Sequence, residues 1–247
     1  MIPDKFEYYA PPTLPEVIAI LQQHPGETKL LAGGQSLIPL MKFRLANFNH
    51  LVDLRKVPGL SVLQEQDGYL RIGAMTREAE LEASPLIQRR YPALYETSGV
   101  VADPLVRNFA TIGGNLAHAD PANDHPATML ALRAIMVAEG PRGWRFIPID
   151  DFLVDTFETA LAPDEILVQI QVPQPTAHSG SAYHKLERKV GDYAIAGVAA
   201  QVKLDGEVVI RAGLGLTNVG PKAIRAVAAE GFLVGKRLDE ATLREAG

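Results

Sequence analysis

The first periodic segment of the chain predicts a helix. Val17, Ile20 and Leu21 recur at helical spacing and share one face. Thr13, with Glu16 three positions later, forms a capping pair at the start of the segment, and a Pro-Gly pair closes it. An amphipathic helix is therefore expected close to the N-terminus.

Shorter apolar runs predict strands, and they alternate with helical patterns through the first half of the chain. The strand-like runs lie within residues 28–34, 50–60, 69–76 and 135–140, and the helical ones within residues 76–96 and 126–134. The first of these strands is expected to be buried. This alternation predicts a domain built from both helices and strands.

The pattern changes after a last strand-like run that prolines at 173 and 175 close, because residues 175–180 have the composition of a linker. Beyond it, Asp205-Gly206 separates two alternating segments and predicts a β-hairpin. The tail predicts helices within 221–235 and 239–247. We therefore expect an α+β chain, with one domain over residues 1–175 and a smaller sheet-plus-helix domain over 176–247.

Two glycine pairs interrupt the apolar runs, Gly33-Gly34 in "AGGQS" and Gly113-Gly114 in "TIGGN", each expected in a turn after a strand-like segment. A glycine pair lets consecutive N–H groups point into one concave cradle that suits a diphosphate. No Lys or Arg occurs in residues 30–39 or 109–121, so the backbone would supply the donors. Short polar side chains that could add hydrogen bonds accompany both pairs: Gln35, Ser36, Thr111 and Asn115.

A single glycine pair is most often an ordinary tight turn. Two matched pairs favour a phosphate ligand on which both turns converge, and a side chain added at Gly33 or Gly113 is expected to fill the cradle. Neither the Gly-x-Gly-x-x-Gly pattern of dinucleotide-binding domains nor a P-loop is present. The sequence therefore disfavours both of those nucleotide-binding folds.

Composition narrows the classes of partner. The chain carries 24 Lys and Arg against 29 Asp and Glu, a net charge of −5, and its cations are scattered, which argues against nucleic acid. No apolar run reaches the roughly 18 to 20 residues that a membrane span needs, so a cytoplasmic protein is expected. Because the chain contains no cysteine, any iron–sulfur cluster that it works with must lie on another chain.

Two polar clusters admit more than one interpretation. The segment "HADPANDH" brings together groups that could bind a metal, namely His118, Asp120, Asp124 and His125. Its prolines and spacing favour an ordinary loop instead, in which Asp124 caps the following helix. In "KLERKVGDY", Lys185 and Tyr193 either belong to a charged exposed strand with a turn at Gly191, or supply a cation and an aromatic face to an electron-accepting ring.

Three segments in this order, "AGGQSLIPLMKFRLA", "TIGGNLAHADPANDHPA" and "KLERKVGDYAIAGVAA", resemble the FAD-binding medium subunit of molybdenum hydroxylases, of the carbon monoxide dehydrogenase medium-chain type. The resemblance runs from Ile2 to the end of the chain. It implies an FAD-binding fold of the vanillyl-alcohol-oxidase type, with two α+β subdomains divided near residue 55, followed by a flavoprotein C-terminal domain. Family members usually continue a few tens of residues further, so this last domain is expected to be truncated.

The resemblance also implies the residues that bind the cofactor, and it implies neither a catalytic residue nor a metal site. The FAD diphosphate and ribityl chain would contact Ala32, Gly33, Gly34, Gln35, Ser36, Thr111, Ile112, Gly113, Gly114 and Asn115. Asp124 would hydrogen-bond the cofactor and Leu167 would pack near its adenine. Lys185 and Tyr193 would lie near the isoalloxazine, and Val101 would make a further contact.

In enzymes of this family a large molybdopterin subunit oxidises the substrate, a small subunit with 2Fe–2S clusters relays electrons, and the FAD subunit passes them to a final acceptor. The resemblance therefore implies both partner subunits, assembled as a dimer of heterotrimers. Two alternatives stay open: a free-standing flavin oxidoreductase of the same fold, and a metal-dependent hydrolase built on "HADPANDH". The substrate and the final acceptor cannot be read from this chain.

Overall fold

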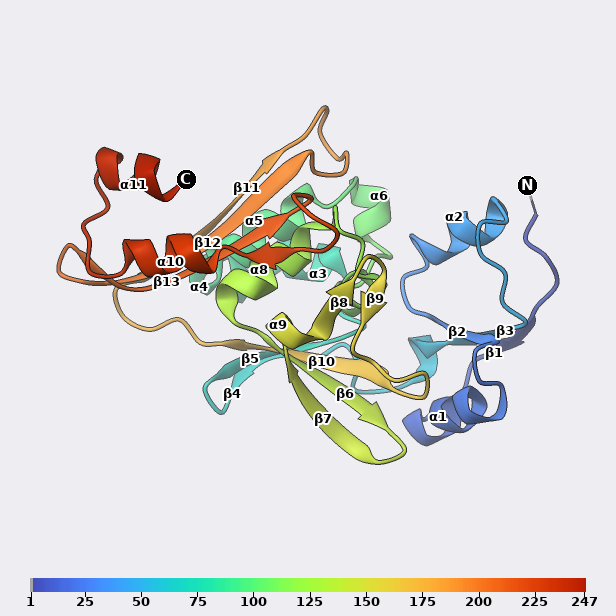
Figure 1. Cartoon of the computed structure of the whole chain (residues 1–247). Coiled ribbons are helices and arrows are strands. Elements are labelled where there is room, and N and C mark those ends of the chain that lie inside the picture. The colour runs from blue at the N-terminus through green and yellow to red at the C-terminus, as the bar shows by residue number, and fades with distance from the viewer. Residues whose placement is uncertain (1) are drawn as a thin grey trace.

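The computed structural model of the chain describes residues 2–247 and places them around three main sheets (Figure 1). The first sheet is parallel, in the order β1 (Glu7–Tyr9), β3 (His50–Asp53), β2 (Thr28–Leu31). Helix α1 (Leu14–Gln23) follows β1, and Thr13 accepts a hydrogen bond from the Glu16 N–H at its start, which confirms the predicted cap. Only the last residue of β2 is buried, so the expectation of a buried strand here is wrong.

The second sheet is antiparallel and forms the centre of the molecule. Its order is β4 (Leu63–Gln66), β5 (Tyr69–Gly73), β10 (Ile166–Pro173), β6 (Ile135–Gly140), β7 (Gly143–Pro148). Apolar side chains of this sheet contribute to two core clusters. One is shared with α1, and the other is shared with a group of helices from the middle of the chain. These helices are α3 (Glu78–Ala83), α4 (Pro85–Arg90), α5 (Pro92–Val100), α7 (Ile112–His118), α8 (Asp124–Leu132) and α9 (Ile149–Phe152).

The third sheet packs against α5 and α8, so that these two helices lie between it and the central sheet (Figure 1). It is antiparallel, in the order β11 (Ser179–Leu186), β12 (Ala196–Asp205), β13 (Val208–Thr217), β14 (Ile224–Arg225). The predicted hairpin at Asp205-Gly206 is confirmed, since Asp205 pairs with Val208 and Gly206 has a φ of +57°. The tail helices are α10 (Val227–Leu233) and α11 (Glu240–Ala246), so the first begins later than predicted because residues 224–225 pair with β13.

The remaining elements are short: α2 (Leu37–Lys42), η1 (Leu54–Lys56), α6 (Pro104–Arg107), and the paired strands β8 (Leu153–Asp155) and β9 (Glu158–Thr159). A bilayer crossing would need a longer and more apolar helix than any that residues 2–247 form.

The second glycine pair is not in a turn, contrary to the sequence prediction. Gly113 and Gly114 lie in the first turn of α7, neither has a positive φ, and the segment before them is α6 rather than a strand. Thr111 starts the helix, because its side-chain oxygen accepts a hydrogen bond from the Gly114 N–H at 3.2 Å. Such a cap stabilises a helix by about 1 kcal/mol, which offsets a similar cost of one glycine within it.

Candidate cofactor-binding site

The first glycine motif joins the end of β2 to the start of α2. Gly34 has a φ of +75°, a conformation that favours glycine, and confirms that this segment turns sharply. In residues 2–247 no protein acceptor pairs with the N–H groups of the four residues 33–36. A series of consecutive unpaired N–H groups is the arrangement that proteins use to bind phosphate.

The second motif uses its backbone differently. The N–H groups of Ile112 and Gly113 donate to the carbonyl oxygens of Thr76 and Ala74, at 3.1 and 3.0 Å. The next two N–H groups donate to the side chain and the carbonyl oxygen of Thr111. This motif therefore offers no free backbone donors, and the prediction of two amide cradles is wrong for the second pair.

One side chain of the second motif is nevertheless available to a ligand. The Asn115 Oδ1 atom is buried, and it has no hydrogen-bond partner within the described residues 2–247. The backbone oxygen of the same residue accepts from Asn123 Nδ2 at 3.0 Å, which holds this part of α7 in place. A buried oxygen without a partner is costly, so a donor on a bound molecule would stabilise it.

The two motifs, 80 positions apart in sequence, lie against each other as predicted. A Cβ atom on Gly114 would lie 3.5 Å from the Ala32 Cβ, and one on Gly33 would collide with the backbone of Phe109 and Ala110. The expectation that such an atom would fill a phosphate cradle is wrong, because the space is already taken by protein. The same holds for Gly113, whose Cβ would lie 2.5 Å from the Ala74 carbonyl oxygen.

A buried polar network lies behind this site and joins α8 to β11. Tyr183 Oη donates to Asp124 Oδ1 at 2.5 Å, and Lys185 Nζ donates to Asp124 Oδ2 and to the Val100 carbonyl oxygen, both at 3.1 Å. Only 3% of the Lys185 side chain and 7% of the Asp124 side chain are exposed. Asn123 occupies the N-cap position of α8, so the capping role predicted for Asp124 is wrong.

Burial raises the pKa of Asp124, and the hydrogen bond from Tyr183 and the charge of Lys185 act against that rise. Burial, together with the Asp124 carboxylate, also holds the pKa of Tyr183 far above its usual range. The Lys185 ammonium lies between two acidic groups, Asp124 at 3.1 Å and Glu187 at 3.5 Å. This environment differs from the exposed charged strand that the sequence admitted, although Arg188, paired with Asp192 at 3.1 Å, matches that description.

The structure places the other predicted contact residues in different environments. Tyr193 is 60% exposed on the connection between β11 and β12. Val101 is buried at the end of α5, where its carbonyl oxygen accepts from Arg107 Nη1 at 3.1 Å. Leu167 is buried in the core cluster of the central sheet. Contacts between these three residues and FAD remain predictions.

The residues of "HADPANDH" do not converge on one point. The His118 ring packs against Phe157, Asp120 accepts from the Ala122 N–H, and His125 lies 2.6 Å from Glu78 in a pair that is fully buried. Within residues 2–247 there is no group of three or more His, Asp or Glu side chains that could hold a metal ion.

Sequence reasoning missed two members of these buried networks. Tyr183 could have been found, since residues two apart on a strand share a face and Lys185 was already a candidate. Glu78 could not, because 47 positions separate it from His125 and no local pattern links them.

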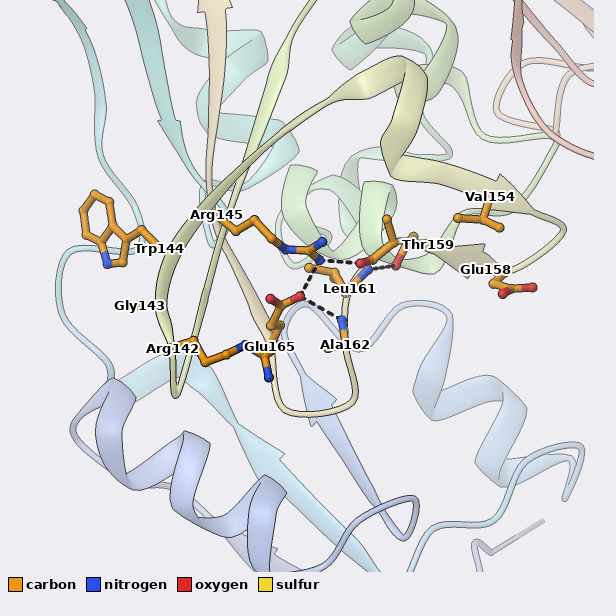
Figure 2. A pocket seen from close by; sticks show the side chains of 11 residues that line it. Arg142, Gly143, Trp144, Arg145, Val154, Glu158, Thr159, Leu161, Ala162 and Glu165 are labelled. Atoms are coloured by element: carbon orange, nitrogen blue, oxygen red, sulfur yellow. Dashed lines mark hydrogen bonds and ion pairs between the residues drawn. The ribbon is translucent and has the colours of Figure 1, made fainter.

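A cavity of about 460 Å³ lies elsewhere, between the β6–β7 hairpin and the β8–β9 strands (Figure 2). Arg145 donates to the Ala160 carbonyl oxygen and to Glu165, whose carboxylate also accepts from the Ala162 N–H. Figure 2 shows the Trp144 ring directed away from these groups. Arg145 and Glu165 are thus paired within this cavity, and none of the predicted site residues lines it.

The fold and the free amides define a domain that can hold a diphosphate-containing cofactor. Comparison with known families identifies this cofactor as FAD. Residues 4–175 match the family described as FAD binding domain in molybdopterin dehydrogenase, and residues 181–247 match the CO dehydrogenase flavoprotein C-terminal domain. The chain belongs to the FAD-binding subunit family of the molybdenum hydroxylases, of the CO dehydrogenase and xanthine dehydrogenase type. This confirms the predicted α+β fold class, the resemblance and the FAD-binding domain.

Individual relatives agree over the full length of the chain. It is 44% identical over 246 residues to the carbon monoxide dehydrogenase medium chain of Hydrogenophaga pseudoflava, covering 100% of this chain and 86% of that one. A chain in the structure of carbon monoxide dehydrogenase from the same organism, lacking the Mo-pyranopterin moiety, superposes with a TM-score of 0.97 at 46% identity, covering 100% and 86%. Quinoline 2-oxidoreductase from Pseudomonas putida 86 gives a TM-score of 0.92 at 36% identity, covering 100% and 85%.

Proposed function

We propose that this chain is the FAD-carrying electron-transfer subunit of a molybdenum hydroxylase complex. A small subunit with 2Fe–2S clusters supplies the electrons, a large molybdopterin subunit oxidises the substrate, and this chain passes the electrons to a final acceptor. The complex is a dimer of heterotrimers in the cytoplasm. The lack of cysteine supports this division of labour, because thiolates that hold iron–sulfur clusters must come from another chain.

The observation that carries FAD binding is the run of unpaired N–H groups over residues 33–36, next to the unpaired Oδ1 of Asn115. The four amides supply donors for the diphosphate, and Asn115 supplies an acceptor for a hydroxyl of the ribityl chain. When bound, FAD couples one-electron donors to two-electron acceptors. The protein's own contribution is to bind and orient the cofactor.

The remaining assignments extend this proposal. Domain boundaries at residues 175 and 176, with a division near residue 55, would separate the two FAD-binding subdomains from the flavoprotein C-terminal domain. The bonds from Tyr183 and Lys185 to Asp124 join those two domains, and so hold the connection that carries Tyr193 in place beside the site. Lys185 and Tyr193 then lie near the isoalloxazine, Leu167 near the adenine, and Val101 along the cofactor.

Purification of the tagged chain from cells that produce it tests the proposal. We expect a flavin absorption spectrum, FAD on release by denaturation, and an iron–sulfur chain and a molybdopterin chain in the same preparation. FAD without iron or molybdenum partners would favour the free-standing flavin oxidoreductase. A bound zinc or iron ion without flavin would contradict both and favour the hydrolase.

A further inference from the structure

Arg107, the last residue of α6, is a buried cation that none of the proposed contacts with FAD uses. Its side chain is 10% exposed. Its Nε and Nη2 atoms donate to the two carboxylate oxygens of Glu82 on α3, at 2.8 and 3.2 Å. Its Nη1 atom donates to the carbonyl oxygens of Val101 and Ala102, at 3.1 and 3.4 Å. A guanidinium bonded in this way fixes the geometry of its partners, because its planar fork allows few orientations.

The two carbonyl groups belong to a sharp reversal of the backbone between α5 and α6. Ala102 has a φ of +46°, in the left-handed region that residues other than glycine seldom adopt. The guanidinium holds this reversal, and Glu82 ties the guanidinium to α3. One turn earlier on α3, Glu78 donates its N–H to the Ala110 carbonyl oxygen at 3.0 Å. Residues 101–110, which we call the α6 segment, are therefore attached to α3 near both of their ends.

One end of the α6 segment packs against the first glycine motif. A Cβ atom on Gly33 would collide with the backbone of Phe109 and Ala110, so these two residues rest directly against the glycine. Gly33 opens the run of unpaired N–H groups over residues 33–36. Because protein interiors are close-packed and transmit displacements, a shift of the α6 segment moves these amides.

The other end of the α6 segment supports the connection between β11 and β12. Gly191 in this connection has a φ of +85°, and a Cβ atom on it would lie 2.7 Å from the Ala102 carbonyl oxygen. That oxygen is one of the acceptors of Arg107. Tyr193 follows Gly191 by two positions. The guanidinium therefore fixes the atom against which the chain leading to Tyr193 rests.

We infer that Arg107 is a positioning residue for the cofactor. Through the α6 segment it sets the spacing between the free amides of the first glycine motif and the connection that carries Tyr193. This inference rests on the proposed function, in which the amides meet the diphosphate of FAD and Tyr193 lies near the isoalloxazine. Arg107 acts through these two groups rather than by contact with FAD.

Arg145 provides a matched control, because it bonds the same kinds of acceptor in another part of the molecule. It donates to the Glu165 carboxylate at 2.6 Å and to the Ala160 carbonyl oxygen at 2.5 Å (Figure 2). None of the predicted site residues lines the cavity in which it lies. If losing any anchored guanidinium disturbed FAD through a general loss of stability, Arg145→Met would act like Arg107→Met.

The test compares Arg107→Met with Arg145→Met in the tagged full chain. Flavin fluorescence titration measures the Kd for FAD, and visible circular dichroism of the bound FAD reports the surroundings of its isoalloxazine. Arg107→Met should raise the Kd at least about tenfold, a change of about 1.4 kcal/mol, and should change the dichroism spectrum. Arg145→Met should keep the parent Kd and spectrum.

A second variant removes the anchor and leaves the guanidinium in place. The Glu82 side chain is 38% exposed, so Glu82→Ala is expected to fold even if Arg107→Met does not. It should change the Kd and the dichroism spectrum in the same direction as Arg107→Met, by a smaller amount. A parent-like Kd and spectrum in Glu82→Ala would overturn the inference.

Three further results would overturn it. The first is a parent-like Kd in Arg107→Met, and the second is an equal change of both readouts in Arg145→Met. The third is a weaker Kd with an unchanged dichroism spectrum, because the connection that carries Tyr193 would then be independent of Arg107. Failure of the proposed function is a separate result, since the unchanged chain would then bind no FAD.

Discussion

Removal of the Lys185 ammonium is the change whose consequence follows most directly from the structure. In Lys185→Met the side chain keeps a similar length but loses its charge, and Asp124 keeps only the hydrogen bond from Tyr183. Asp124 is 93% buried, so its carboxylate would remain charged in a site that water hardly reaches. Breaking a buried ion pair from one side typically costs about 3–5 kcal/mol.

The free energy of unfolding is measured by urea titration, and the melting temperature by calorimetry. In a chain of this size each kcal/mol corresponds to about 2–4 °C, so we expect a decrease of about 6–20 °C. The double variant Asp124→Asn/Lys185→Met should recover much of the loss, because replacing both partners leaves no unpaired charge at the buried position 124. A single variant as stable as the parent would refute the reasoning, and so would a double variant less stable than the single one.

The pH dependence supplies a second readout of the same change. Burial already raises the pKa of Asp124 above its ordinary 3.8, and loss of Lys185 removes one of the effects that oppose the rise. Because the folded state then binds a proton more tightly than the unfolded state, stability increases as the pH falls through this range. The deficit of Lys185→Met should be largest at neutral pH and should shrink in acid, whereas a pH-independent deficit would contradict the ion-pair explanation.

Three further predictions follow from the site and the first helix. Asn115→Ala should weaken FAD binding about tenfold by flavin fluorescence titration without lowering the stability of the FAD-free chain, because it removes an unpaired buried oxygen; an unchanged Kd would contradict the assigned contact. Gly113→Val should lower the free energy of unfolding by about 1–3 kcal/mol or more, since its side chain meets the Ala74 backbone, and a urea midpoint equal to the parent's would oppose this explanation. Thr13→Ala should cost about 1 kcal/mol in the same assay while Thr13→Ser costs little, and equal losses from both would show that the hydroxyl cap is not the cause.

The features that sequence reasoning predicted correctly depend on residues close together in the chain. The Thr13 cap needs only the N–H three positions later, and the Asp205-Gly206 hairpin needs only a positive φ between two alternating segments. The absence of cysteine is a matter of composition. Such features depend little on the rest of the molecule, which is why a pattern can predict them.

Why glycine is required at positions 33 and 113 depends on tertiary contacts that no local sequence pattern contains. The sequence predicted that Gly33 and Gly113 leave space for a phosphate. In the structure, both positions exclude a side chain because backbone from a distant part of the sequence packs against them. Whether an N–H group is free for a ligand depends on every other acceptor in the fold, so only the structure could separate the free amides of residues 33–36 from the paired amides of α7.

The sequence by itself determined the α+β class, the approach of the two glycine motifs to each other and the absence of any cysteine that could hold an iron–sulfur cluster. Only the tertiary structure decided the environment of Lys185, which meets Asp124 from 61 positions away and is buried rather than exposed. The physical reason is that burial and charge pairing are set by how sheets and helices pack, and packing brings together residues whose separation along the chain carries no signal.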